Sequence, residues 1–172
     1  MSKFKNNKGF TLIELLVVIA LIAVSIGVVG VASSNSAQNS LRKCTHAADN
    51  LLSRVRINAM HRAEPVFAEF VVAGGNIVGR YYEDADTSPP DEIMGRNNIT
   101  MTYTINGDTQ TLGTGNPLRI SFTRRGELIL VDENGAKIEG SLRQIRFTLS
   151  DNARGYVIDI TPATGSRQLR AR

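Results

Sequence analysis

Cysteine is nearly absent from this chain of 172 residues, which holds one, Cys44. A single cysteine excludes an intrachain disulfide. Cys44 falls at an apolar position of a helical pattern, and free cysteines are often buried, so we expect a buried structural thiol. An intermolecular bridge is the alternative.

Groupings of residues that carry catalysis are also missing. The two histidines, His46 and His61, lie fifteen residues apart on one predicted helix, which is too far to share a site. Neither has a cysteine at metal-ligand spacing, and the chain has no P-loop or nucleophile elbow. We therefore expect no enzyme activity, no bound metal and no cofactor, and we interpret both histidines as surface residues.

A proline-broken acidic stretch covers residues 83–92. Its carboxylates could bind calcium, but they do not follow the twelve-residue ligand order of an EF-hand. A solvated loop is the simpler interpretation, and an ion site is the alternative.

The chain does have one long apolar segment, residues 10–31, in which only Thr11, Glu14 and Ser25 are polar. About 20 apolar residues suffice for a helix to cross a bilayer. Three lysines precede this segment, and basic residues stay on the cytoplasmic side. The pattern predicts a single-pass helix with its N-terminus inside and the rest of the chain exported. A cleaved secretory signal and a plain anchor are the alternatives.

Glu14 is the one charged residue of the apolar segment. A charged carboxylate in the middle of a membrane costs roughly 2.5–3.5 kcal/mol on insertion scales. We therefore expect Glu14 to pair with a cation, or else to extend toward the headgroups.

The sequence GFTLIELLVVIALIAV, which begins at Gly9, resembles the class III signal of type IV pilins and type II secretion pseudopilins. The resemblance implies that a prepilin peptidase cleaves between Gly9 and Phe10 and methylates the new amino group of Phe10. The helix is then retained, and Glu14 would pair with the amino terminus of a neighbouring subunit. Other implied partners are further pilin subunits and the inner-membrane assembly platform. The implied location is the bacterial inner membrane, followed by an extracytoplasmic pilus or pseudopilus.

Beyond the membrane the helix is expected to continue as an amphipathic helix to about Glu64, before Pro65. Its apolar stripe follows three- and four-residue spacing and comprises Leu41, Cys44, Ala48, Leu51, Leu52, Val55 and Ala59. Residues 33–40 are polar and have weak helical propensity, so an interruption of the helix is open at this stretch. We thus expect a leader at residues 1–9, a membrane or filament-core helix at 10–32, its amphipathic continuation at 33–64, and a β-rich head at 65–172.

The head alternates apolar and polar residues, which is typical of half-buried strands. Residues 66–72 and 77–82 flank a Gly-Gly-Asn turn and predict a hairpin, and residues 99–105 predict a further strand. More strands are expected around residues 118–122, 128–130, 145–149 and 156–160. The fold class is therefore α+β, with a long N-terminal helix packed on an antiparallel sheet.

The end of the helix and the last strand are similar to H-type minor pseudopilins and related minor type IV pilins. The residues concerned are 51–62 and 158–167. This resemblance favours a minor filament subunit of a type IV pilus or type II secretion system. The major pilin of a type IV pilus is the alternative.

The C-terminal region is rich in arginine: Arg154, Arg167, Arg170 and Arg172 accompany a single acid, Asp159. Some minor pilins bind DNA during uptake, and their C-terminal arginines resemble this arrangement. Neutralisation of phosphates by these arginines would give non-specific, salt-sensitive affinity. The alternative is a solvated terminus.

Overall fold

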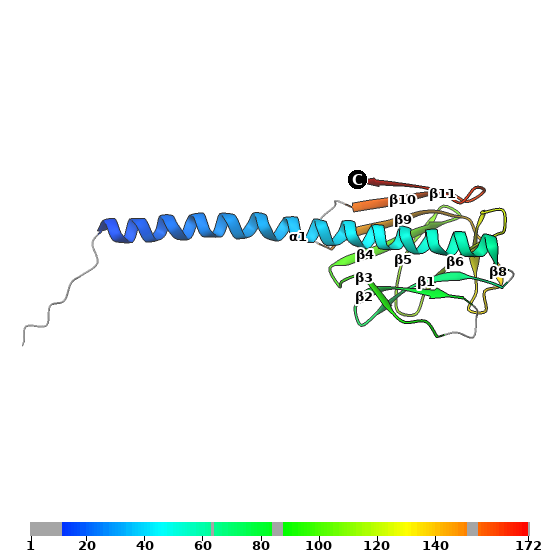
Figure 1. The fold of residues 1–172 in the computed structure, drawn as a ribbon. Helices are drawn as coiled ribbons and strands as arrows, with labels where there is room; N and C mark the ends of the chain where they lie inside the picture. The colour runs from blue at the N-terminus through cyan, green and yellow to red at the C-terminus, as the bar shows by residue number, and fades with distance from the viewer. Residues whose placement is uncertain (1–11, 63, 84–87, 151–154, 172) are drawn as a thin grey trace, which may run out of the picture. The chain divides into compact units, whose positions relative to one another are not determined.

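The computed structural model describes residues 12–62, 64–83, 88–150 and 155–171 (Figure 1). It divides the chain into two compact units, Met1–Gln38 and Asn39–Arg172. A single helix, α1 (Leu12–His61), begins in the first unit and ends in the second. All strands of the described residues lie in the second unit, which we call the head. The predicted α+β class with antiparallel strands is therefore confirmed.

The head part of α1 is amphipathic as the sequence predicts. Every residue of the expected apolar stripe, from Leu41 to Ala59, is buried. The helix runs through residues 33–40 without interruption, and it ends at His61 rather than at Glu64. The proline at position 65 limits how far the helix can extend, because it disfavours helical conformation in the residue before it, Glu64.

The first sheet has six strands in the order β3-β2-β1-β6-β7-β8, and each neighbouring pair is antiparallel. These strands are β1 (Phe67–Ala73), β2 (Asn76–Tyr82), β3 (Glu92–Gly95), β6 (Leu118–Phe122), β7 (Leu128–Val131) and β8 (Lys137–Ile138). Strands β1 and β2 form the predicted hairpin, with Ala73 opposite Asn76.

The second sheet has five strands in the order β11-β10-β9-β4-β5, again antiparallel. These strands are β4 (Ile99–Ile105), β5 (Asp108–Thr111), β9 (Leu142–Leu149), β10 (Gly155–Thr161) and β11 (Ser166–Ala171). Strand β11 pairs with β10 along its length, so these residues are an ordered edge strand rather than a frayed terminus.

The expectation of one sheet is wrong, because the strands separate into two. Strand β1 takes β6 as its second neighbour, whereas β4 takes β9. Alternation of apolar and polar residues shows which face of a strand is buried, but it does not show which strand lies next to it. The division into two sheets depends on these long-range pairings.

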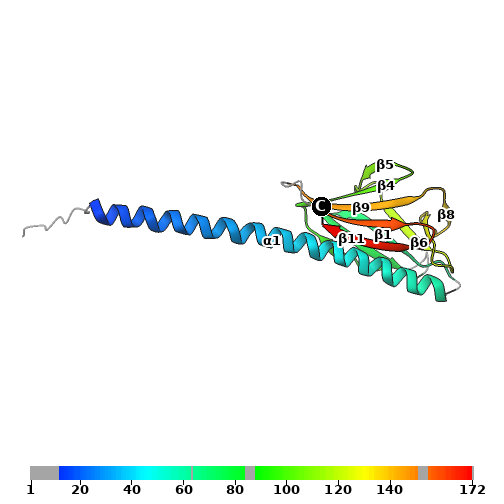
Figure 2. The same ribbon diagram turned by 90° about the horizontal axis from the view of Figure 1, so that it is seen from above.

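Within the head, α1 contacts both sheets, and Figure 2 shows the helix running along the strands. Asn58 donates a hydrogen bond of 2.5 Å to the hydroxyl of Tyr81 in β2. Arg167 of β11 donates to Asp49 of α1 at 2.7 Å. The core of the head includes Phe70 and Phe147, which are fully buried. The helix therefore links the two sheets through polar contacts at the margin of this core.

Gly165, in the turn between β10 and β11, is expected to tolerate no side chain. Its φ is +61°, and a Cβ there would clash with the carbonyl oxygen of Gly126 and lie 3.0 Å from the Phe122 ring. Left-handed backbone costs a non-glycine residue about 1–2 kcal/mol, and overpacking adds about 1–3 kcal/mol. Gly165→Ala should therefore lower the free energy of unfolding by about 2–4 kcal/mol in urea titrations.

Two other glycines serve as controls that separate the loss of stability due to backbone strain from the loss due to overpacking. Gly107 has φ +98° and no atom near a new Cβ, so Gly107→Ala tests backbone strain alone. Gly113 has neither positive φ nor a close neighbour, so Gly113→Ala should be nearly neutral. Equal unfolding midpoints for all three variants would contradict the close packing of the Gly165 turn.

Candidate functional site

The described part of the apolar segment presents its large side chains to solvent in the isolated chain. Leu12 is 83% exposed and Val18, the least exposed, is 46% exposed. The other large apolar residues between them and just beyond are exposed as well: Ile13, Leu15, Leu16, Val17, Ile19, Leu21 and Ile22. An apolar surface of this extent is typical of a site that binds other proteins or a membrane.

Glu14 lies in the first turn of α1, among these side chains. A carboxylate in the first turn of a helix interacts favourably with the helix dipole. Gly9 and Phe10, the predicted cleavage residues, lie outside the described residues.

No helix in the described part of the chain is both long and apolar enough to cross a membrane.

The C-terminal arginines are not equivalent. Arg154 and Arg172 lie outside the described residues. The side chain of Arg167 is only 11% exposed, and it pairs with Asp49 at 2.7 Å and donates to the hydroxyl of Ser53 at 2.6 Å. Arg170 is 65% exposed and pairs with Asp159 at 3.1 Å. Arg167 thus fastens the last strand to α1, while only Arg170 of the two lies open to a ligand. DNA binding stays a prediction.

This difference predicts unequal effects of substitution. Arg167→Ala leaves Asp49 without its cation and removes an anchor of β11, so it should lower the free energy of unfolding by about 2–4 kcal/mol. Arg170→Ala removes an exposed pair and should cost under about 1 kcal/mol. Urea unfolding of both variants measures the difference. Equal decreases in the free energy of unfolding would contradict the distinct roles of the two arginines.

A buried carboxylate on the first sheet was missed from the sequence. Glu69 in β1 has a side chain only 4% exposed, and its two oxygens accept from Arg80 at 2.9 Å and Arg119 at 2.7 Å. Arg80 also pairs with Asp91 at 2.6 Å. The hydrogen bond to Asp91 is the largest cause that raises the pKa of Arg80, and Arg80 in turn lowers the pKa of Asp91.

Beside this cluster, Tyr82 stacks on Phe67 with ring centroids 4.5 Å apart. Burial is the main cause that raises the pKa of the Tyr82 hydroxyl, and the charge of Glu69 adds to it. Arg80 and Arg119 lie opposite Glu69 on the neighbouring strands β2 and β6. Each carboxylate oxygen of Glu69 is thus held by an arginine, so the cluster is best explained as a structural element of the sheet.

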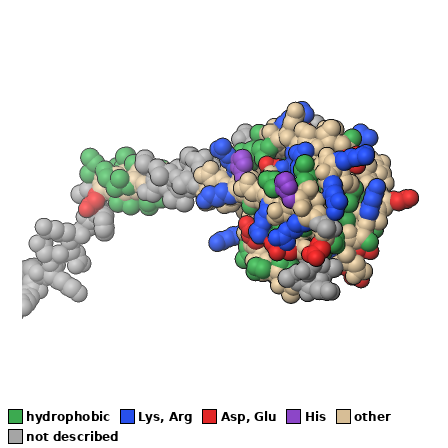
Figure 3. Space-filling view, turned by 45° about the vertical axis from the view of Figure 1, so that its right-hand side comes forward, with side chains coloured by type: hydrophobic (Ala, Val, Ile, Leu, Met, Phe, Trp, Pro, Cys, Tyr) green, Lys and Arg blue, Asp and Glu red, His purple; other side chains and the backbone are tan. Residues whose placement is uncertain are grey.

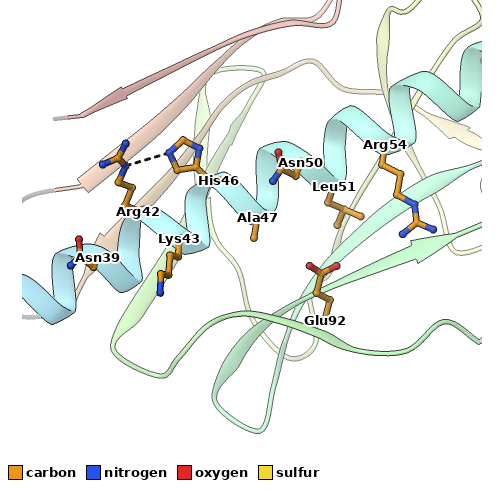
Figure 4. Close-up of a pocket in the computed structure, with 9 residues that line it drawn as sticks. All are labelled: Asn39, Arg42, Lys43, His46, Ala47, Asn50, Leu51, Arg54 and Glu92. Atoms are coloured by element: carbon orange, nitrogen blue, oxygen red, sulfur yellow. Dashed lines mark hydrogen bonds between the residues drawn. The ribbon is translucent and has the colours of Figure 1, made fainter.

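A groove of about 870 Å³ runs along the outer side of α1 in the head (Figure 4). We call it the basic groove; its lining residues are Asn39, Arg42, Lys43, His46, Ala47, Asn50, Leu51, Arg54 and Glu92. Its charged side chains are three exposed bases and one exposed acid. Figure 3 shows lysine, arginine and histidine side chains gathered on a face of the head.

A hydrogen bond and a cation–π contact hold two of the basic side chains of the groove in place. Arg42 donates to Nε2 of His46 at 3.5 Å, so that ring nitrogen acts as an acceptor. The guanidinium of Arg54 lies 3.9 Å above the Tyr81 ring, a cation–π contact. Glu92 of β3 points toward the helix from the other side of the groove (Figure 4). The helical spacing of Arg42, Lys43 and Arg54 was visible in the sequence, but the opposing strand was not.

The remaining candidate residues are one cysteine and two histidines, all on α1. Burial raises the pKa of the Cys44 thiol to about 12, so the thiol stays protonated. His46 and His61 are both exposed on α1, as the sequence predicts. No group of three or more metal-ligating side chains occurs among the described residues.

Comparison with known proteins assigns only the start of the chain. Residues 4–30 match the family described as the prokaryotic N-terminal methylation motif. This match supports a type IV pilin-like precursor that a prepilin peptidase processes. Neither a curated protein nor a solved structure gave a significant match to the chain.

Proposed function

We propose that this chain is a subunit of a type IV pilus or of a type II secretion pseudopilus. It is made as a precursor, cut between Gly9 and Phe10 by a prepilin peptidase and methylated on Phe10. The helix is retained, holds the subunit in the bacterial inner membrane as a single pass, and then packs against the helices of other subunits in the filament. Leader, filament-core helix, amphipathic continuation and head follow in that order along the chain.

The match to the N-terminal methylation motif is the observation that supports this proposal most. It spans residues 4–30, a range that includes Gly9, Phe10 and Glu14. Cleavage at this point removes the three lysines and leaves the apolar segment at the start of the mature chain. We propose that this apolar segment serves the mature chain both as its anchor and as a surface for assembly.

The exposure of the apolar residues between Leu12 and Ile22 is consistent with this function. Burying apolar surface yields about 25 cal/mol per Å², so each side chain covered by lipid or by another helix stabilises the covered state. In the head, the amphipathic part of α1 packs on two antiparallel sheets. The head is therefore a folded unit that is joined to the apolar segment through the same helix.

The resemblance of residues 51–62 and 158–167 to H-type minor pseudopilins supports a minor subunit. A major pilin is the alternative within the same class. Counting this chain against the other subunits in purified filaments separates the two, because a minor subunit is a small fraction of the whole.

Mass spectrometry of the native protein tests the proposed processing. We expect a chain that lacks residues 1–9 and carries one methyl group on the amino nitrogen of Phe10. A chain that retains residue 1 in the mature filament, or one that lacks the apolar segment, would exclude the proposed function.

A further inference from the structure

We propose that the basic groove of one subunit receives the acidic hairpin of a second copy of this chain. The acidic hairpin is the turn between β7 and β8 with its flanks, residues 132–139. This contact rests on the proposed function and, within it, on the major-pilin alternative, because copies of this chain are neighbours along a filament only when it is the main subunit.

The bases of the groove are available for such a contact. Arg42, Lys43 and Arg54 are exposed, and none of them forms an ion pair within the described residues. By contrast, Arg80, Arg119 and Arg167 have carboxylate partners within the head. The groove is therefore a positive surface that the head itself does not neutralise.

The acidic hairpin is a rigid ligand. Asp132 Oδ1 accepts hydrogen bonds from the backbone N–H groups of Asn134 and Ala136, both at 2.9 Å, which fixes the turn. Glu133 and Glu139 are exposed beside it, and neither forms an ion pair within the described residues. A turn that is already ordered loses little conformational entropy when it binds.

The two surfaces carry mirrored charge patterns. The groove has Arg42, Lys43 and Arg54 with one acid, Glu92. The hairpin has Asp132, Glu133 and Glu139 with one base, Lys137. A polyanion such as DNA or an anionic membrane would be repelled by Glu92, whereas the hairpin can offer Lys137 to it. Complementary charges of this kind fix the register of a protein contact.

Apolar side chains complement each other as well. Ile138 of the hairpin is 45% exposed in spite of its apolar side chain. Ala47 and Leu51 line the groove between its charged residues. Seating Ile138 against them would remove the exposed surface of Ile138 from water, with Ala47 half-buried and Leu51 buried at the base of the groove.

The positions of the two surfaces require a second copy. A Cβ at Gly135 in the hairpin would lie 2.9 Å from Pro65, which follows the end of α1 at His61. The groove instead lies at the other edge of the first sheet, because its Glu92 belongs to β3, at one end of the strand order, whereas the hairpin carries β8, at the other end. The hairpin thus cannot reach the groove of its own chain. A contact between two different surfaces of identical subunits is heterologous, and it extends a fibre when the rotation between subunits does not close a ring.

Charge reversal in the full-length chain tests this contact. Arg42→Glu with Lys43→Glu, and separately Glu133→Lys with Glu139→Lys, should each reduce incorporation into filaments about tenfold, the effect of 1.4 kcal/mol. Combining all four substitutions should restore incorporation to within about twofold of wild type. The control is Arg124→Glu with Arg143→Glu, because both arginines are exposed and lie outside the groove. This control variant should be incorporated into filaments as well as wild type.

Cross-linking tests the same contact in assembled filaments. A chain with Lys43→Cys and Glu139→Cys should give a ladder of covalent multimers on oxidation, and one with Lys43→Cys and Arg143→Cys should not. Cys44 is buried and stays out of the reaction. Thermal unfolding of each variant checks that the exposed substitutions leave the head folded.

The outcomes separate this contact from the proposed function. Normal incorporation of both reversed variants, or no ladder, would overturn the contact while wild-type filaments still form. The groove variant could lose incorporation while the hairpin variant is incorporated normally. That result would assign the groove to a different acidic partner and would overturn the role of a second copy. A wild-type chain that keeps residues 1–9 and never assembles would overturn the proposed function, and the contact with it.

Discussion

Glu14→Gln is expected to leave cleavage and methylation intact but to prevent efficient incorporation into filaments. Glutamine keeps the shape and hydrogen-bonding capacity of the side chain and removes only its charge. In an apolar environment a charged carboxylate is costly, by roughly 2.5–3.5 kcal/mol at the centre of a membrane. A filament subunit that retains it therefore gains something from the charge, and the new amino terminus of the next subunit is the cation we propose.

Glu14→Asp is the matched variant, because it keeps the charge on a shorter side chain. We expect it to incorporate better than Glu14→Gln and less well than wild type. The measurement is the ratio of this subunit in purified filaments to the processed subunit left in the membrane. Normal incorporation of Glu14→Gln would exclude a role for the charge in assembly.

Local patterns predicted a large part of this structure. The stripe from Leu41 to Ala59 was predicted from helical spacing, and all its residues are buried. The β1–β2 hairpin followed from a Gly-Gly-Asn turn between two apolar runs. In these cases the signal and the structure lie within one stretch of chain, so the periodicity of side chains is sufficient to find them.

Contacts between distant parts of the chain were not predictable in the same way. Arg167 and Asp49 are 118 residues apart in sequence, and nothing in either neighbourhood indicates the other. The same holds for Glu69, which reads as a polar residue in a strand until Arg80 and Arg119 are placed on either side of it. Arg167 was named as a candidate for DNA binding, which stays a prediction, and its sequence neighbourhood gave no sign of its internal partner Asp49.

The basic groove also depends on contacts between distant parts of the chain, so the sequence did not predict it. Its arginines and lysine lie off the apolar stripe of the helix, and the simplest interpretation of such charges is a solvated face. Only the strand that brings Glu92 opposite α1 makes a groove of them. A charge pattern with a specific shape is a stronger argument for a partner than a net charge is.

Glu69→Ala is expected to destabilise the head strongly, by about 2–4 kcal/mol in urea unfolding. The substitution removes the carboxylate that Arg80 and Arg119 share and leaves both guanidinium groups without it. Breaking a buried ion pair on one side costs about 3–5 kcal/mol. Because these arginines are 28% and 24% exposed, water compensates part of that loss.

Asp91→Ala is the control, since it removes the outer partner of the same Arg80 from an exposed position. It should change the stability of the head much less, because Arg80 keeps Glu69 and water replaces Asp91. Glu69→Gln should fall between the two, since the amide oxygen can still accept from one arginine. If Asp91→Ala proved as harmful as Glu69→Ala, the stability of the first sheet would depend on the exposed end of the cluster and not on its buried carboxylate.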